Sequence, residues 1–194
     1  THRPFRAPHH TISPAGLSGG GTVPHPGEIS LAHNGVLFLD EFPEFSRSSM
    51  EALRQPIEDG EITISRIKST LTYPCSVMLI AAMNPCPCGY FNHPTRACSP
   101  QAISRYLAKV SGPILDRLDL HVEVPPVTYR DLTGISKEET SHDIKIRVNA
   151  AREIQNQRHK DFGSIYNSML PSKALNRVCV LTEDAQNILK AAFE

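Results

Sequence analysis

The chain has 194 residues, enough for one α/β domain with a small appendage. Hydrophobic residues make up 40% and charged residues 21%, as in ordinary globular proteins, and no run approaches the roughly 18 apolar residues of a bilayer-spanning helix. Lys plus Arg and Asp plus Glu both number 20, so the formal net charge is zero, and composition does not indicate a broad nucleic-acid surface. With no charged-then-apolar leader, we expect a cytoplasmic protein without a membrane partner.

The first stretch, up to Pro26, is rich in Pro, His and Gly and lacks helical or strand periodicity, which predicts loops and short elements. It contains three consecutive glycines, Gly19, Gly20 and Gly21. No Lys follows them, so they do not form a phosphate-binding P-loop. Two interpretations stay open: a flexible connection, or a loop that touches a polymer threaded past it.

The run Gly35-Val36-Leu37-Phe38-Leu39 precedes two adjacent carboxylates, Asp40 and Glu41. Its four consecutive apolar residues predict a strand that is buried on both faces of a parallel sheet. Ligands bind at the carboxyl edge of such a sheet. The run has the form of a Walker B segment, in which the Asp holds a nucleotide-bound Mg²⁺ and the Glu polarises an attacking water. The alternative is a core strand that ends in an acidic turn.

A helix is predicted after this strand, because Ser46 is a favourable N-cap and Gly60 stands where a helix C-terminus favours glycine. Pro56 should kink or shorten its last turn. Residues 61–73 alternate in polarity and predict a β-hairpin with Arg66 and Lys68 at a basic tip. An ordinary hairpin with a solvated face is the alternative.

A second apolar strand is predicted from Ser76 to Met83, and it ends at Asn84. Because neighbouring parallel strands end at the same edge of a sheet, Asn84 is well placed to reach the crevice of Asp40 and Glu41. The alternative is an Asn that begins the turn before a proline.

Three of the five cysteines, Cys86, Cys88 and Cys98, stand close together with His93 in the intervening loop. Three thiolates and an imidazole would complete a tetrahedral structural zinc site. Reduced, partly buried thiols are the alternative.

Downstream, Ser99 and Pro100 open a helix that runs to about Val110, and a second short helix ends at Arg117. Arg117 is either a surface ion-pair partner or directed towards a neighbouring subunit. A strand is predicted from Leu120 to Val124.

The chain changes character after two consecutive prolines. We expect an α/β core over residues 1–126, a linker over 127–140 and a helical subdomain over 141–194. Ser141 is predicted to cap a helix with one apolar stripe, formed by Ile144, Val148, Ala151 and Ile154.

Five segments together closely resemble the magnesium chelatase-like AAA+ ATPases, and most closely the branch that contains ComM and YifB. They are Arg3-Pro-Phe-Arg-Ala-Pro-His-His, Pro26-Gly-Glu-Ile-Ser-Leu-Ala-His-Asn-Gly-Val-Leu-Phe-Leu-Asp-Glu, Glu51-Ala-Leu-Arg-Gln-Pro-Ile-Glu-Asp-Gly, Ala82-Met-Asn-Pro-Cys-Pro-Cys-Gly and Ser111-Gly-Pro-Ile-Leu-Asp-Arg. The resemblance implies a partial AAA+ module: a P-loop NTPase-type parallel sheet flanked by helices, with a β-hairpin insert and a small C-terminal helical subdomain. Relatives often carry four cysteines where this chain has three.

The resemblance also implies site roles, with ATP and Mg²⁺ as cofactors. Asp40 would hold Mg²⁺, Glu41 would activate water, Asn84 would be the first sensor, and Arg117 would be an arginine finger acting on a neighbour's ATP in a homo-oligomeric, hexameric ring. The triple glycine and the hairpin with Arg66 and Lys68 would face the pore and contact DNA.

Under the same resemblance, the P-loop would precede residue 1 and the second-sensor arginine would follow residue 194. The chain by itself should therefore lack ATPase activity. The implied function is an ATP-driven ring motor on DNA, a helicase that performs branch migration in natural transformation and recombination. The alternatives are a motor subunit of a magnesium chelatase-type metal-insertion enzyme and a non-catalytic, zinc-stabilised interaction module.

Overall fold

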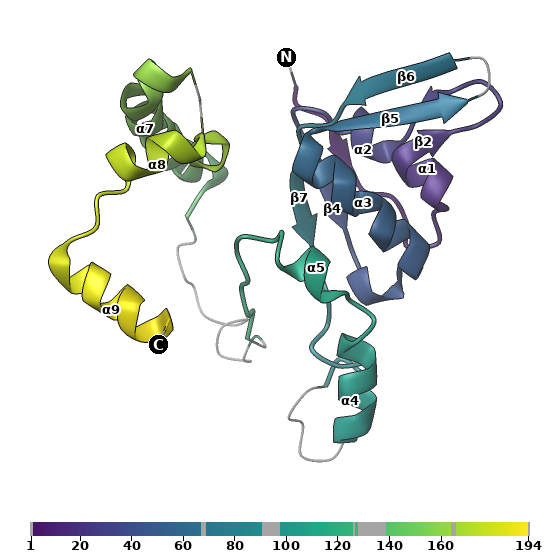
Figure 1. The fold of residues 1–194 in the computed structure, drawn as a ribbon. Helices are drawn as coiled ribbons and strands as arrows, with labels where there is room; N and C mark the ends of the chain where they lie inside the picture. Colours follow the sequence, from purple (N-terminus) through teal and green to yellow (C-terminus); the bar gives the residue numbers. More distant parts are fainter. Residues whose placement is uncertain are drawn as a thin grey trace. The chain divides into compact units, whose positions relative to one another are not determined.

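The computed structural model describes residues 2–66, 69–90, 98–125, 127, 139–163 and 166–193. The chain divides into two compact units, Thr1–Glu123 and Val124–Glu194. In the described residues, all strands belong to the first unit, and the second unit is helical (Figure 1). None of the helices in this described part combines the length and the apolar character that crossing a bilayer requires.

The first unit is built on a parallel sheet of three strands, β1 (Phe5–Arg6), β4 (Val36–Leu39) and β7 (Met78–Ala81), in the order β1-β4-β7. In the register of β4 and β7, Leu37 pairs with Leu79 and Leu39 with Ala81. The predicted α/β fold with a parallel sheet is confirmed. The strand β1 was not foreseen, because two residues are too few to show a period.

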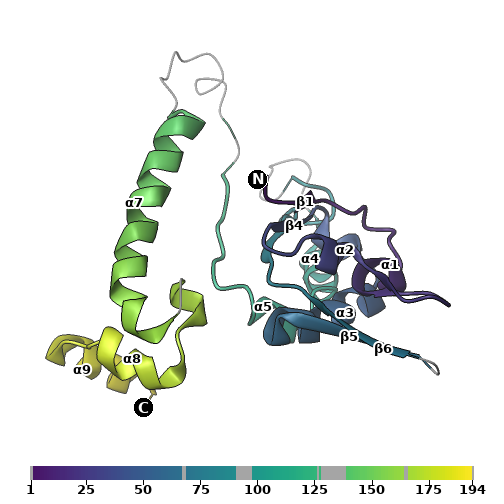
Figure 2. The ribbon, with the colours of Figure 1, turned by 90° about the horizontal axis from the view of Figure 1, so that it is seen from above.

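Three helices connect these strands: α1 (Pro14–Ser18), α2 (Glu28–Leu31) and α3 (Arg47–Asp59). The sheet grows in one direction along the chain, and right-handed crossovers then place every connection on the same face. Figures 1 and 2 show the three helices on one side of the sheet. Burial follows this arrangement, and the core contains Leu17, Ile29, Leu37, Leu39 and Leu53.

The opposite face of the sheet is open in the described residues. Side chains in register on this face include Phe5, Met78 and Ile80, which are 63%, 60% and 41% exposed. The prediction of burial on both faces is therefore wrong for this structure, because the helices cover one face alone. The ring of Phe38 stacks on Phe5 with the centroids 6.2 Å apart.

Gly35 allows β1 to approach β4. A Cβ atom at this position would lie 1.9 Å from the carbonyl oxygen of Pro4, a distance that no real contact permits. That same oxygen accepts a hydrogen bond of 2.9 Å from the backbone N–H of Val36. Only glycine fits here, because the close backbone approach is itself part of the sheet.

The ends of α3 match their prediction: the Ser46 hydroxyl accepts from the N–H of Ser49 at 3.1 Å, and Gly60 has a φ of 68°. Pro56 does not shorten the helix, which continues to Asp59. Its carbonyl oxygen accepts from the N–H of Gly60 at 3.0 Å and from the thiol of Cys75 at 3.3 Å. These two bonds support the turn that the proline was expected to disrupt.

Two antiparallel hairpins accompany the sheet. The strands β2 (Gly19–Gly20) and β3 (His25–Pro26) form one, and β5 (Glu61–Arg66) and β6 (Ser69–Pro74) form the other, as predicted. Ile62 and Ile64 are buried against the core.

Beyond β7, the short helices α4 (Pro100–Leu107) and α5 (Gly112–Leu115) follow the expected pattern. The segment from Leu120 to Val124 forms no strand, which corrects its prediction. Leu120, Val122 and Val124 are more than four-fifths exposed. Alternating polarity produces a strand only where a neighbouring strand accepts its backbone hydrogen bonds.

The second unit consists of α7 (Ser141–His159), α8 (Ser172–Val178) and α9 (Glu183–Phe193), with the short 3-10 turns η2 (Lys160–Phe162) and η3 (Asn167–Met169). The N-cap of α7 is Thr140 and not Ser141: Thr140 and Asp143 form a reciprocal capping box. The predicted apolar stripe of α7 is exposed.

Candidate functional site

Asp40 and Glu41 are held at the carboxyl end of β4 by the buried residues on either side of them, Leu39 and Phe42. The N–H of Phe42 donates to the carbonyl of Ala82 at 2.9 Å, and the N–H of Ala82 donates to the carbonyl of Leu39 at 2.9 Å. The backbone therefore continues along β7 through the turn. Both carboxylates are exposed at the sheet edge where the sequence predicts a site.

The backbone of Glu41 is left-handed, with a φ of 52°. Such a conformation is uncommon for a residue with a side chain, and it occurs where the surrounding structure enforces it, often at functional sites. The Asp40 carboxylate accepts from the N–H of Glu41 at 2.8 Å. The Glu41 carboxylate lies 3.0 Å from Nδ1 of His10, in the segment that follows β1.

A cavity of about 290 Å³ adjoins this turn. The lining residues are Ala7, Pro8, His9, His10, Phe38, Asp40 and Glu41. Carboxylate oxygens are the ligands that Mg²⁺ prefers, and an exposed carboxylate can also accept a proton from water. The donor set therefore fits the predicted metal and water chemistry.

Asn84 lies three residues beyond β7, on the strand adjacent to β4, and it is exposed. The Tyr106 hydroxyl hydrogen-bonds to the backbone of Asn84, and burial raises the pKa of this hydroxyl. Because Tyr106 is buried, it fixes the loop that carries Asn84.

Arg117 forms an ion pair with Glu58 in the last turn of α3. Its Nε atom is buried and has no hydrogen-bond partner in the described part of the chain. The side chain is thus held against its own α3, which corresponds to the first of the two alternatives left open by the sequence.

The predicted pore elements lie side by side. The Tyr73 hydroxyl of β6 donates to the carbonyl of Pro24 at 3.3 Å, between β2 and β3. A Cβ on Gly19 would lie 2.7 Å from Cδ1 of Ile64 in β5. The structure therefore unites the glycine-rich loop and the hairpin, although 40 or so residues separate them in the sequence.

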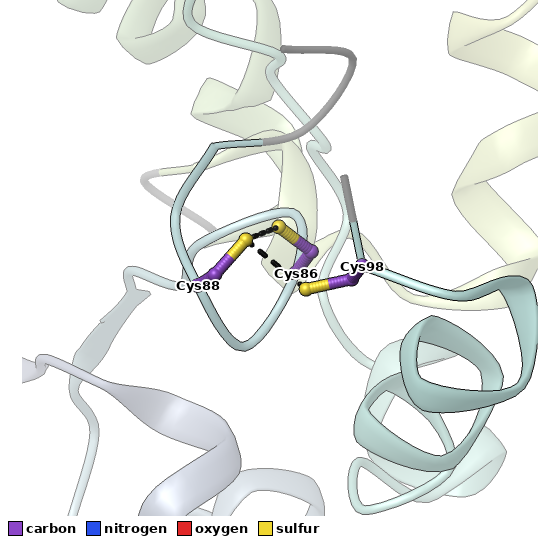
Figure 3. A group of neighbouring side chains, drawn as sticks. All are labelled: Cys86, Cys88 and Cys98. Atoms are coloured by element: carbon purple, nitrogen blue, oxygen red, sulfur yellow. Dashed lines mark hydrogen bonds between the residues drawn. The ribbon is translucent and has the colours of Figure 1, made fainter. Parts of the chain in front are cut away.

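Three thiols form a cluster after β7 (Figure 3). The sulfurs of Cys86, Cys88 and Cys98 all lie within 4.8 Å of one another. The Cys98 thiol donates to the Cys88 sulfur at 3.0 Å. This bond lowers the pKa of Cys88 and raises the pKa of Cys98 to about 11. His93, Lys68 and most of the expected linker lie outside the described residues, and so does the side chain of Arg66.

Sequence reasoning missed His10 as a member of the site. The signal was its position: a residue that follows a strand next to β4 reaches the same carboxyl edge as Asp40. Because β1 was not foreseen, this neighbour could not be inferred.

Two family models match the chain. The model described as magnesium chelatase, subunit ChlI, matches residues 1–132, and the model for the C-terminal part of the same subunit matches residues 138–194.

Among curated proteins, competence protein ComM of Haemophilus influenzae is 49% identical over 98% of this chain and 37% of its own length. The uncharacterized protein YifB of Salmonella typhimurium is 48% identical over 94% of this chain and 35% of its own length. The chain therefore spans about a third of the length of the curated relatives that it matches.

Among solved structures, NtrX from Brucella abortus in complex with ADP aligns with a TM-score of 0.41 and 19% identity. The alignment covers 60% of this chain and 24% of that one. A likeness this low carries no argument about function.

Proposed function

The chain belongs to the magnesium chelatase, subunit ChlI, family, and we propose that its carboxylate turn forms part of the ATP hydrolysis site of an AAA+ ring motor that acts on DNA. The observation that carries the proposal is the turn itself: Asp40 and Glu41 are exposed at the carboxyl edge of a parallel sheet, beside a cavity. The enforced left-handed backbone of Glu41 adds to it.

In this proposal Asp40 holds Mg²⁺, which neutralises charge on the phosphate oxygens of bound ATP. Glu41 accepts a hydrogen bond from the attacking water and so orients its lone pair towards the γ-phosphorus. Asn84 donates a hydrogen bond to the same region from the next strand. Arg117 serves the ATP of a neighbouring subunit after it leaves Glu58, which makes the ring a hexameric homo-oligomer in our proposal.

DNA is the proposed polymer for two reasons. The glycine-rich loop adjoins the β5–β6 hairpin, which would present Arg66 and Lys68 together with backbone N–H groups to phosphates. One relative is named a competence protein, and competence concerns DNA uptake. We therefore favour branch migration or unwinding during transformation over metal insertion.

The decisive experiment compares ATP-driven unwinding of forked DNA by the full-length protein with that of its Glu41→Gln variant. We expect the variant to lose about 100-fold or more in ATPase kcat, because Gln cannot accept the proton of the water. Glu44→Gln is the matched control: Glu44 lies in the same turn but pairs with Lys109 at 2.9 Å. Equal rates for wild type and Glu41→Gln would overturn the assignment.

DNA contact is tested separately by binding to forked DNA across a salt series. Replacing Arg66 and Lys68 with Ala should weaken binding and reduce the slope of log affinity against log salt by about 2, one per lost phosphate contact. Stimulation of ATPase activity by a porphyrin, without stimulation by DNA, would favour the chelatase alternative.

Zinc is a second proposal, carried by the thiol cluster. Around a zinc ion, thiolate sulfurs stand roughly 3.8 Å apart, as follows from Zn–S bonds of about 2.3 Å in a tetrahedron. The three sulfurs are already gathered to within 4.8 Å, so Cys86, Cys88 and Cys98 fit three positions, with His93 as the proposed fourth ligand. Zinc here would stabilise the loop.

Metal analysis of the purified protein should find one equivalent of zinc, and Cys88→Ser should remove it. Cys179→Ser is the control, because Cys179 is exposed in the second unit. Zinc-free wild-type protein that keeps its fold would contradict this proposal and the zinc-stabilised module alike.

A further inference from the structure

The Glu41 side chain is poorly anchored compared with its backbone. The N–H of Glu44 donates to the Glu41 carbonyl at 2.7 Å, and Asp40 accepts from the Glu41 N–H, so the backbone is fixed twice. The side chain is 57% exposed. Within the described residues, one group pairs with its carboxylate: Nδ1 of His10, at 3.0 Å.

His10 is the better anchored partner. Its side chain is 27% exposed, and its ring meets the edge of Phe45, a core residue, with the centroids 6.4 Å apart. On another side it packs against the ring of His9 at 4.0 Å. The His9 ring is itself fixed by a hydrogen bond of 2.9 Å between its Nδ1 and the Thr11 hydroxyl. A held group therefore contacts a mobile one.

We propose that His10 is a positioning residue, which holds one oxygen of the Glu41 carboxylate so that the other is directed at the attacking water. This inference rests on the proposed ATP hydrolysis. An ionised carboxylate only accepts hydrogen bonds, so Nδ1 of His10 is the donor in the contact.

The geometry of the carboxylate makes this arrangement productive. Oε2 is occupied by His10, and Oε1 stays available to accept a hydrogen bond from water. Orienting a catalytic group in advance removes its rotational freedom before the reaction, which lowers the barrier of the chemical step. Because His10 contacts neither water nor nucleotide in this proposal, its effect falls on kcat and not on nucleotide binding.

Three variants of the full-length protein separate the hydrogen bond from the ring. In His10→Asn the side-chain amide nitrogen takes the place of Nδ1 and can donate, although the ring is lost. In His10→Phe the ring remains to pack against Phe45, but the donor is lost. His10→Ala removes both. Steady-state ATPase kinetics and the affinity for a non-hydrolysable ATP analogue with Mg²⁺ are measured for each.

We expect His10→Ala and His10→Phe to lower kcat about tenfold, while KM and the analogue Kd stay within about twofold of wild type. His10→Asn should retain kcat within about threefold of wild type. A merely structural role for the ring predicts the reverse order, with His10→Phe as the active variant, and that result would overturn the proposal.

Two other outcomes are informative. A rise in kcat in His10→Ala would mean that His10 restrains Glu41, and this would also overturn the inference. Absence of ATPase activity in the wild-type full-length protein would defeat the proposed function, whereas active wild type with fully active His10→Ala and His10→Phe would defeat this inference alone.

Discussion

The two units of the chain differ in what their apolar side chains contact. In the first unit, Leu37, Leu39 and Phe42 are buried in a continuous core that the sheet shares with its helices. In the described part of the second unit, Ala174 is the buried apolar residue, and His159 is buried with it. Ile188 and Phe193 are 73% and 87% exposed.

The comparison separates two sources of order. The helices of the second unit follow from local signals, such as the capping box of Thr140 and Asp143 and the acidic first turn of α9. These signals begin a helix but bury little apolar surface. The first unit adds long-range contacts, and only these hold site residues from β1, β4 and β7 at one edge.

The largest expected effect is at the centre of the sheet. Replacing Leu37 with Ala should lower the free energy of unfolding by about 3–5 kcal/mol, because Leu37 is fully buried and the fold leaves a cavity behind. The measurement is urea unfolding of the 194-residue chain. Leu189→Ala is the matched control: Leu189 is half exposed in α9, and its loss should cost less than about 0.5 kcal/mol. Equal losses would remove the contrast between the units.

A smaller effect is expected from pH, through Cys75. Burial, helped by the carboxylates of Glu61 and Asp59, raises the pKa of the Cys75 thiol from 9.0 to about 11. A raised pKa favours the neutral thiol in the fold, so its contribution is complete below pH 9 and is lost between pH 9 and 11. The loss amounts to about 2 kcal/mol.

Urea unfolding at pH 8 and pH 11 measures this loss, and the difference between wild type and Cys75→Ser isolates it, because Ser does not ionise in this range. Cys179→Ser, in the exposed second unit, should behave as wild type. A pH-dependent loss that is the same in Cys75→Ser would place its origin elsewhere.

The smallest effect concerns the start of α7. Thr140→Ala should weaken the first turn by about 1 kcal/mol, because the hydroxyl that accepts from the N–H of Asp143 is lost. Hydrogen exchange of the α7 amides should show the change as faster exchange near Thr140. Ser141→Ala is the control that separates the two candidate caps, and it should have almost no effect. If Ser141→Ala had the larger effect, the cap would be the one that the sequence pattern predicted.

The sequence predicted the elements whose signals are local. The strand before Asp40, the helix between Ser46 and Gly60 and the β5–β6 hairpin each carry their pattern within about a dozen residues, so their positions could be read directly. The close thiols of Cys86 and Cys88 follow in the same way from two positions in one turn.

Other features depended on contacts that no local pattern contains. The strand β1 exists because Gly35 lets the backbone of Pro4 approach, and the Leu120–Val124 segment lacks strand structure although its residues alternate. The pairing of Arg117 with Glu58 likewise joins residues far apart in the chain.

The carboxylate turn illustrates the division. The sequence by itself determined that Asp40 and Glu41 end a buried strand, because polarity changes abruptly after four apolar residues. Only the tertiary structure decided that β1 is its neighbour, that Glu41 adopts a left-handed backbone and that His10 meets its carboxylate. The physical reason is that polarity and caps act between residues close in the chain, whereas strand order and side-chain pairing arise when distant segments bury surface together.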